Sequence, residues 1–340
     1  MSKTLIEIPI IDFAPFIRGD ADSRRAVAQQ VYQACHEIGF MYLRNTGISQ
    51  TVIDQLFTQT KHFFDLPLEV KNQLAWSDEF SNRGYVGVER ERLDPDKPGD
   101  LKEAFNVGKE VNSDKSSTEE KPSRILNPWP PGQDDFRETV LEFYQACAQV
   151  ADTICQAFAI ALCAVAKPIA LHLPESFFSD RHTAQNHTLR LLHYPPLEQL
   201  PKPGQVRAGE HSDYGSFTLL FQDEVGGLEV CTAQGEWIAA PCIPDTILVN
   251  TGDLMQRWTN HVFCSTKHRV MIPSDERVKL SRYSVAFFCH PNDDTEIACL
   301  ESCKEPNRPP LFGSAGDIAT SRLPFKTVLD SFPSHGSSVI

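Results

Sequence analysis

The sequence predicts an α+β fold in which helices support a core of short strands. Helical periodicity dominates the 340-residue chain up to about residue 166. From about residue 186 onward, strand-length runs follow one another with Gly, Pro, Asn or Asp between most of them. Helices and strands segregated in this way pack as one unit, with the helices against a sandwich or barrel of strands.

The N-terminal region predicts two short strands and three helices. The apolar run IPIIDF, residues 8–13, is typical of a strand. Residues 22–38 carry apolar side chains at three- and four-residue spacing, which indicates an amphipathic helix. Residues 39–47 return to strand character and end in a turn, a second helix follows over 49–64, and Pro67 opens a third.

The middle of the chain is less regular. Residues 80–110 carry mixed turn and strand signals. Residues 108–133 have no hydrophobic period and are rich in charge, Ser and Pro, so they form either a long surface loop or a flexible linker. A long helical pattern then covers residues 134–166.

Six strand-length runs follow in the C-terminal half. Two of them, SFTLLFQ and GLEVCT, are separated by Gly226-Gly227, and this arrangement predicts two strands joined by a glycine turn. The complete set is HTLRLLHY, SFTLLFQ, GLEVCT, TILVNTG, STKHRVMI and LSRYSVAFF.

The composition argues against several kinds of partner. A hydrophobic content of 41% and a charged content of 23% are typical of a globular protein in water. The net charge of −13 argues against nucleic acid. No signal peptide pattern and no run of 18 apolar residues is present, and ten scattered cysteines without C-x-x-C indicate reduced thiols. We therefore expect a cytoplasmic protein that binds neither nucleic acid nor a membrane, and we expect it to be a monomer.

A polar triplet, His211-Ser212-Asp213, precedes the apolar run SFTLLFQ. One or two H-x-[DE] triplets are expected by chance from 11 His and 45 carboxylates, so the triplet alone is weak evidence. Residues two apart on a strand point to the same face, which lets His211 and Asp213 reach a single ion. The triplet is either a solvated turn or part of a metal site.

A second histidine, His268, lies downstream in the strand run STKHRVMI. Two imidazoles and one carboxylate occupy half of an octahedron and leave three positions open. This ligand set recurs in non-heme Fe(II) oxygenases. Taken alone, His268 is equally well explained as a core histidine with ordinary hydrogen bonds.

Arg282 and Ser284 share one face of the run LSRYSVAFF. A guanidinium pairs bidentately with a carboxylate, and a hydroxyl adds one more donor. Polar side chains that face into a buried strand need a partner. An ordinary salt bridge would supply one, and a bound carboxylate would supply another.

With these motifs in this order, the chain resembles the isopenicillin-N-synthase-like branch of the Fe(II)/2-oxoglutarate-dependent dioxygenases over residues 6–300. The resemblance implies a double-stranded β-helix, or jelly roll, wrapped by helices, with His211, Asp213 and His268 as catalytic iron ligands. The matching motifs are IPIIDF, GFMYLRNTGI, FFDLPLEVK, RGY, NPWP, HYPP, HSDYGSFTLLFQD, GGLEV, VNTGDLMQRWTN, HRV and RYSVAFF.

The resemblance also implies a site for 2-oxoglutarate. Arg282 and Ser284 are similar to the pair that binds its distal carboxylate, and Tyr194 is similar to a tyrosine that often joins them. Many relatives place an Asn two residues before this tyrosine, where this chain has Leu192. This departure concerns the residues that contact the oxygens of the co-substrate and not the core site.

The implied reaction uses Fe(II), 2-oxoglutarate and O₂ and releases succinate and CO₂. A C–H bond of a small organic molecule would be hydroxylated, desaturated or closed into a ring. Asp213 argues against halogenation. Halogenating relatives usually have a small residue in its place, which leaves a coordination position free for halide. A same-fold Fe(II) oxidase that does not use 2-oxoglutarate and a non-catalytic metal sensor remain alternatives. Zinc-dependent hydrolysis is disfavoured, because a helical H-E-x-x-H is absent.

The expected organisation is one integrated unit. It comprises an N-terminal region (1–110), a surface loop (111–133), the support helix with the jelly-roll core (134–300), and a C-terminal segment (301–340) with a short helix at 323–331.

Substrate contacts are expected from several regions. The charged, turn-rich segment 90–105 is a candidate lid, although ordinary packing or a solvated loop explains it equally well. The candidate substrate-binding residues are the aromatic walls Phe105, Phe217 and Phe288 and the cations Arg90 and Arg92. With Lys102, these two cations would attract an acidic substrate, although a run of charges also suits a solvated face.

Overall fold

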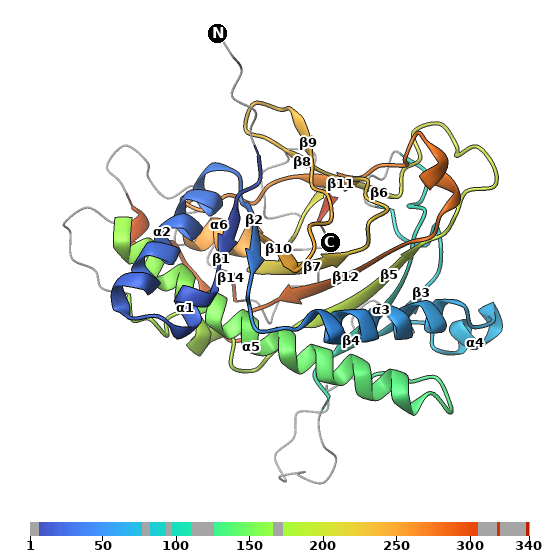
Figure 1. The fold of residues 1–340 in the computed structure, drawn as a ribbon, viewed down its shortest axis with the longest axis horizontal. Coiled ribbons are helices and arrows are strands. Elements are labelled where there is room, and N and C mark those ends of the chain that lie inside the picture. The colour runs from blue at the N-terminus through green and yellow to red at the C-terminus, as the bar shows by residue number, and fades with distance from the viewer. Residues whose placement is uncertain are drawn as a thin grey trace.

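The computed structural model describes residues 7–76, 82–92, 97–110, 126–165, 173–304, 318–319 and 338–339. Two β-sheets enclose the interior of the protein, and helices cover the outer face of the larger sheet (Figure 1). This is the α+β arrangement with a jelly-roll core that the sequence predicts.

The larger sheet has eight strands in the order β1-β2-β10-β7-β12-β5-β4-β3. Its strands pair antiparallel, apart from the parallel pair β1 and β2. Their bounds are β1 Ile10–Asp12, β2 Phe40–Arg44, β3 Gly84–Val86, β4 Glu103–Gly108, β5 Thr188–Tyr194, β7 Phe217–Gln222, β10 Thr246–Thr251 and β12 Arg282–Cys289.

The smaller sheet has the order β15-β6-β11-β8-β9, and β13 pairs with β14 in a separate ribbon. A β-bulge lies between β6 and β11, since His268 pairs with His211 whereas Val270 pairs with Ala208. The bounds are β6 Ala208–Ser212, β8 Leu228–Cys231, β9 Trp237–Ala239, β11 His268–Val270, β13 Glu296–Ile297, β14 Ile318–Ala319 and β15 Ser338–Val339.

The helices begin at clear sequence signals. Asp20 caps α2 by accepting a hydrogen bond from the Ser23 amide, and Ser49 caps α3 through the Val52 amide. Pro67 precedes α4, as expected from its fixed φ. The helices are α1 Ala14–Arg18, α2 Ala21–Glu37, α3 Gln50–Phe64, α4 Leu68–Gln73, α5 Asp134–Val165 and α6 Asp253–Trp258.

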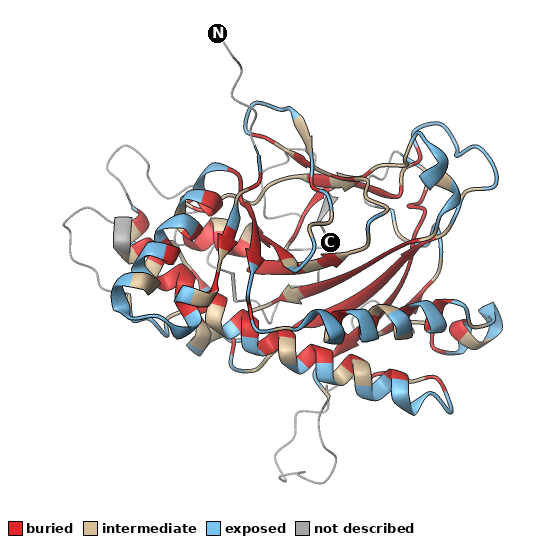
Figure 2. Ribbon diagram, viewed as in Figure 1, coloured by how far each residue is buried: buried red, intermediate tan, exposed pale blue. Residues whose placement is uncertain are grey.

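The longest helix, α5, supports the larger sheet. It packs against α2, α3 and β12, and its inward face is buried (Figure 2). By length and composition alone α5 would be long and apolar enough to cross a membrane, but most of its apolar stretch is buried inside this structure. Packing in the core therefore accounts for its apolar character.

Strand β12 separates two apolar clusters by simple alternation of side chains. Tyr283, Val285 and Phe287 face the helices and belong to the larger cluster. Ala286 and Phe288 point to the opposite side, into the space between the two sheets. One strand thus contributes to the core beneath the helices and to the wall of the jelly roll.

The predicted strands and helices agree with the structure. Gly226 and Gly227 form the predicted turn, with positive φ, between β7 and β8, and these two strands lie in different sheets. A Cβ on Gly227 would lie 2.6 Å from the Met271 carbonyl oxygen, so the corner requires glycine. The helix expected at 323–331 and most of the loop 111–133 lie outside the described residues.

Phe105 lies in the larger apolar cluster, where its ring centroid is 4.5 Å from that of Phe63 and 5.8 Å from that of Phe136. Phe105→Ala is expected to lower the free energy of unfolding by about 3–5 kcal/mol, because it removes a fully buried ring. Denaturant titration measures this change. The control Leu126→Ala, at a position 77% exposed, should stay within about 0.5 kcal/mol of wild type. A loss below about 1 kcal/mol for Phe105→Ala would contradict this packing.

Candidate active site

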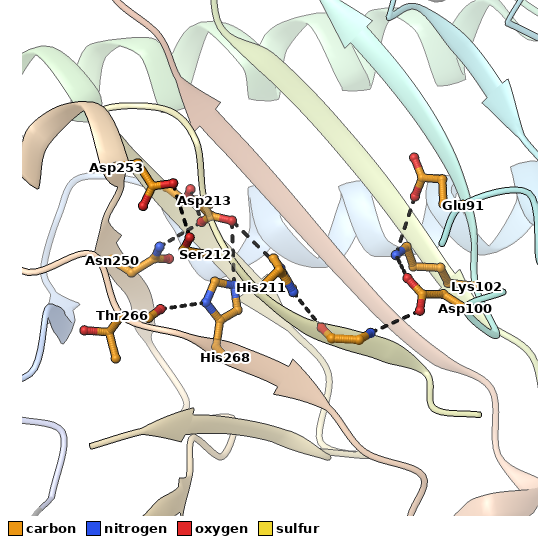
Figure 3. A network of polar contacts seen from close by, with 12 residues as sticks. Glu91, Asp100, Lys102, His211, Ser212, Asp213, Asn250, Asp253, Thr266 and His268 are labelled. Carbon is orange, nitrogen blue, oxygen red and sulfur yellow. Dashed lines mark hydrogen bonds and ion pairs between the residues drawn. The ribbon is translucent and has the colours of Figure 1, made fainter. Parts of the chain in front are cut away.

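Three potential ligands meet between the two sheets (Figure 3). His211 lies on β6, Asp213 follows the end of β6, and His268 begins β11 beside His211. Asp213 Oδ1 is 4.0 Å from His211 Nε2 and 3.6 Å from His268 Nε2. All three side chains are buried, and their ligand atoms lie within 4.8 Å of one another.

Backbone carbonyl groups orient both imidazoles. The Nδ1 of His211 lies 2.7 Å from the Gly209 carbonyl oxygen, and the Nδ1 of His268 lies 3.1 Å from the Thr266 carbonyl oxygen. With a proton on Nδ1, each Nε2 keeps a free lone pair directed toward Asp213. Metal-ligating histidines are commonly held by this kind of outer contact.

Two side chains hold the carboxylate of Asp213. Thr218 Oγ1 donates to Asp213 Oδ2 at 2.5 Å, and Asn250 Nδ2 donates to the same oxygen at 2.7 Å. Oδ1 is therefore the oxygen that faces the imidazoles. The strands β7 and β10, which carry Thr218 and Asn250, fix the carboxylate from behind.

The charges of the triad suit a metal. Burial, followed by the neighbouring His268, lowers the pKa of His211 to about 3, so its imidazole is neutral near pH 7. Burial opposes ionisation of Asp213, but the two histidines and the hydrogen bonds from Asn250 and Thr218 together lower its pKa. A neutral imidazole and an ionised carboxylate are the forms that bind Fe(II), so the residues present fit the ion.

The same cavity contains a buried guanidinium. Arg282 is 1% exposed, donates to Ser284 Oγ at 3.2 Å and to Gln222 Oε1 at 3.0 Å, and lies with Cζ 4.7 Å from the ring centroid of Tyr194. Its Nε has no hydrogen-bond partner, and no carboxylate oxygen of the described residues lies within 4.0 Å. Arg282, Ser284 and Tyr194, which the motifs predict together, all line this cavity.

A second group of charges forms the wall between β4 and β5. Lys102 and Arg190 line the cavity, and two carboxylates pair with them. Lys102 Nζ lies 2.6 Å from Asp100 Oδ2 and 3.5 Å from Glu91 Oε2, and Arg190 Nη2 lies 2.5 Å from Glu91 Oε2. We call Lys102, Arg190, Asp100 and Glu91 the charged wall. Its formal charges cancel.

The charged wall is connected to the metal triad. Asp100 Oδ1 accepts a hydrogen bond from the Gly209 amide at 3.1 Å, and the carbonyl of Gly209 contacts His211 Nδ1 (Figure 3). The segment before β4 therefore supports the backbone that orients one imidazole.

The predicted substrate residues divide into two groups. Phe288 lines the cavity, as predicted. Phe105 and Phe217 do not line it, because both belong to the apolar cluster beneath the helices, where Phe217 packs against Phe158.

The two predicted cations also lie elsewhere. Arg90 is exposed and donates to the Trp76 carbonyl oxygen at 3.3 Å, and Arg92 is exposed as well. Neither lines the cavity. The cations that do line it are Lys102 and Arg190. Lys102 was one of the three cations expected to attract a substrate, whereas Arg190 was not predicted.

A signal for some of the unpredicted residues was present in the sequence. Arg190 in TLRLLHY and Asn250 in TILVNT are polar positions within buried strands, just as Arg282 is in its own strand. The argument that an inward polar residue needs a partner applies equally to them. The pairing of Lys102 with Asp100 has no such signal, because it depends on the path of a loop.

Comparisons with known proteins agree with this geometry. A family model described as the 2OG-Fe(II) oxygenase superfamily matches residues 181–291, and one described as "non-haem dioxygenase in morphine synthesis N-terminal" matches residues 8–132. The 2-oxoglutarate-Fe(II) type oxidoreductase hxnY of Emericella nidulans is 32% identical over 314 residues, which cover 89% of this chain and 86% of the relative. The proline hydroxylase buaE of Petromyces alliaceus is 34% identical, with 89% and 93% covered.

A solved structure is similar over nearly the whole chain. It is that of a full-length Neurospora crassa protein in complex with α-ketoglutarate and thymine, with 31% identity, a TM-score of 0.81, and 98% and 99% of the two chains covered. The chain belongs to the 2OG-Fe(II) oxygenase superfamily. Within it, the chain is a 2-oxoglutarate-dependent dioxygenase of the isopenicillin-N-synthase-like type, a class that uses Fe(II), 2-oxoglutarate and O₂.

If the triad holds the metal, Asp213→Ala should weaken Mn(II) binding at least a hundredfold, since it removes the only anionic ligand from a buried site. Isothermal titration calorimetry of the metal-free protein measures this. Asp275→Ala, which removes an exposed carboxylate paired with Arg277, is the matched control and should bind Mn(II) as wild type does. Unchanged affinity in Asp213→Ala would refute the assignment.

Proposed function

We propose that His211, Asp213 and His268 bind Fe(II) and that the enzyme oxidises a C–H bond of a small organic molecule in the cavity they line. The observation that carries this proposal is the buried triad, with neutral His211 and ionised Asp213, in one cavity with Arg282, which has no carboxylate oxygen within 4.0 Å among the described residues. Fe(II), when bound, supplies the activation of O₂ that couples oxidation of 2-oxoglutarate to oxidation of the substrate.

The protein residues divide the work of binding 2-oxoglutarate. We propose that Arg282 and Ser284 bind the distal carboxylate, because a guanidinium and a hydroxyl on one strand face can donate hydrogen bonds to both of its oxygens. Tyr194 lies beneath the guanidinium and holds its plane. This end is buried, so a carboxylate bound there would be shielded from water, which strengthens the ion pair.

The charged wall is suited to bind an oxygen atom of the substrate. Lys102 has three donors, and two carboxylates occupy only part of them. Arg190 Nε is buried without a hydrogen-bond partner. Because the wall is neutral overall but keeps spare N–H donors, it favours a substrate with a carbonyl or carboxylate oxygen. The relatives named for proline hydroxylation and crystallised with thymine concern molecules that carry such oxygens.

Apolar side chains complete the cavity. Phe40, Leu220, Leu228 and Val270 line it together with Phe288. These side chains would pack against the carbon skeleton of the substrate and exclude water from the reacting C–H bond.

The remaining expectations about partners are also proposals. The net charge of −13 supports an enzyme that does not bind nucleic acid. All ten cysteines lie in the described part of the chain and none is disulfide-bonded, which supports a reducing, cytoplasmic setting. We further propose that the enzyme acts as a monomer on a small-molecule substrate.

The function is tested by following succinate. Incubation with Fe(II), O₂ and 2-oxoglutarate should release succinate, and a substrate found by screening metabolite pools should accelerate it. Arg282→Met should raise the apparent KM for 2-oxoglutarate about tenfold or more, because a charge-assisted pair is lost. Oxidation of the true substrate without succinate formation would instead identify an oxidase that does not use 2-oxoglutarate.

The role of the charged wall is tested with the substrate found in that screen, which begins with thymine and L-proline. Lys102→Met should raise the substrate KM about tenfold while the KM for 2-oxoglutarate changes less than about twofold. Lys102→Arg keeps the charge and should retain most of the affinity. The Tm of each variant is measured in parallel, because Lys102→Met leaves Asp100 and Glu91 without one cation. Equal rises of both KM values would contradict a role in substrate binding.

A further inference from the structure

A second buried guanidinium, that of Arg207, has no anionic partner. Its side chain is 0% exposed and donates from Nη2 to the Leu280 carbonyl oxygen at 3.0 Å. Nε and Nη1 are buried without any hydrogen-bond partner. Within the described part of the chain, no carboxylate oxygen lies within 4.0 Å of this guanidinium. A fully buried cation without an anion is costly, so the position calls for a ligand.

The location of Arg207 connects it to the 2-oxoglutarate end of the cavity. Arg207 directly precedes β6 in the smaller sheet, and its hydrogen bond reaches Leu280, two residues before Arg282 in the larger sheet. The next residue, Ala208, lines the cavity together with Arg282, whereas Arg207 itself does not line it. Arg207 therefore lies behind the cavity wall, next to the strand that carries Arg282.

The charges at this end do not balance. The ionisable neighbours of Arg207 are Arg282, Tyr194 and the carboxyl group of Asp223, and Asp223 also lies near the cation of Lys61. Asp223 is already committed to the backbone amides of Tyr283 and Val225. Burial, followed by the proximity of Arg282, lowers the pKa of Arg207, as expected for two cations in one apolar region. Two guanidiniums face one carboxyl group, so one further negative charge would neutralise this end.

We propose that Arg207 supports the binding of 2-oxoglutarate from behind the cavity wall, where its positive charge adds to that of Arg282 and stabilises the distal carboxylate. This inference rests on the proposed assignment of Arg282 and Ser284 to that carboxylate. It extends the assignment to a residue outside the R-x-S motif, at the start of the strand that carries His211. The segment RAGEHSD would then serve both ends of the co-substrate, with Arg207 behind the carboxylate and His211 and Asp213 at the metal.

The arrangement predicts selectivity among 2-oxo acids. A carboxylate bound to Arg282 gains a charge-assisted contact and lies near the positive charge of Arg207, whereas a methyl group there leaves both cations without an anion. The protein should therefore discriminate strongly against 2-oxovalerate, which keeps the 2-oxo acid but lacks the distal carboxylate. Arg207 should supply part of that discrimination.

Calorimetry of the Mn(II)-loaded full chain with 2-oxoglutarate and with 2-oxovalerate tests the inference without turnover. Arg207→Met should weaken 2-oxoglutarate binding about tenfold, or 1.4 kcal/mol, and leave 2-oxovalerate binding within about twofold of wild type. Arg207→Lys, which keeps the charge, should recover about half of the loss on a logarithmic scale. Arg137→Met, which removes an arginine paired with Glu110 away from the cavity, is the matched control and should bind both ligands as wild type does.

Two results would overturn the inference. One is wild-type affinity of Arg207→Met for 2-oxoglutarate, and the other is an equal loss for both ligands, which would indicate only structural support. If Arg207→Met fails to fold, Arg207→Lys and Arg207→Gln are compared in the same titration, where equal 2-oxoglutarate affinity of these two variants would count against a charge effect. Arg282→Met distinguishes the proposed distal carboxylate site from the proposed contribution of Arg207 to it. Wild-type binding by Arg282→Met would refute the proposed distal site itself, whereas wild-type binding by Arg207→Met alone would refute only the second cation.

Discussion

The pairing of β11 with β6 is the constraint on which the active site depends. It places His268 beside His211, and the bulge between these strands lets both His211 and Ala208 face the interior. Asp213 lies just beyond the end of β6, where its carboxylate turns toward both imidazoles. A register shift of one residue would send His268 to the opposite face and dismantle the triad.

The larger sheet connects this site to the stability of the whole protein. Each of its central strands presents one side to the helices and the other to the cavity. Of two residues next to each other in sequence, one therefore packs in the core and the other lines the cavity. Arg282 and Ser284 point to the cavity, while Tyr283 and Val285 pack beneath the helices. The long helix α5 covers that outer side and shields the buried polar groups from solvent. By excluding solvent, the helices strengthen the electrostatic interactions within the site, although none of them carries a ligand of the triad.

Much of the fold was predictable from the sequence because local patterns determine it. Periodicity located α2, α3 and α5, and alternation in β12 placed Arg282 and Ser284 on one face. The turn at Gly226-Gly227 was predicted, but not that it changes sheet, because sheet membership depends on contacts distant in sequence. For the same reason, Phe105 and Phe217 were expected in the cavity and instead pack in the core, whereas Lys102 and Arg190 reach the cavity. An aromatic residue in a strand can face either side, and only the assembled layers decide which.

The charged wall has a consequence for how the enzyme can diversify. Lys102 and Arg190 form ion pairs with Asp100 and Glu91. The four side chains therefore place hydrogen-bond donors in a buried space without adding net charge to it. A wall of this kind neither attracts anions from a distance nor repels neutral molecules. The apolar residues around the charged wall, such as Phe288 and Leu220, then determine which substrates fit. Their sizes can change without disturbing the ion pairs. The polar part can therefore stay fixed while shape alone distinguishes one substrate from another.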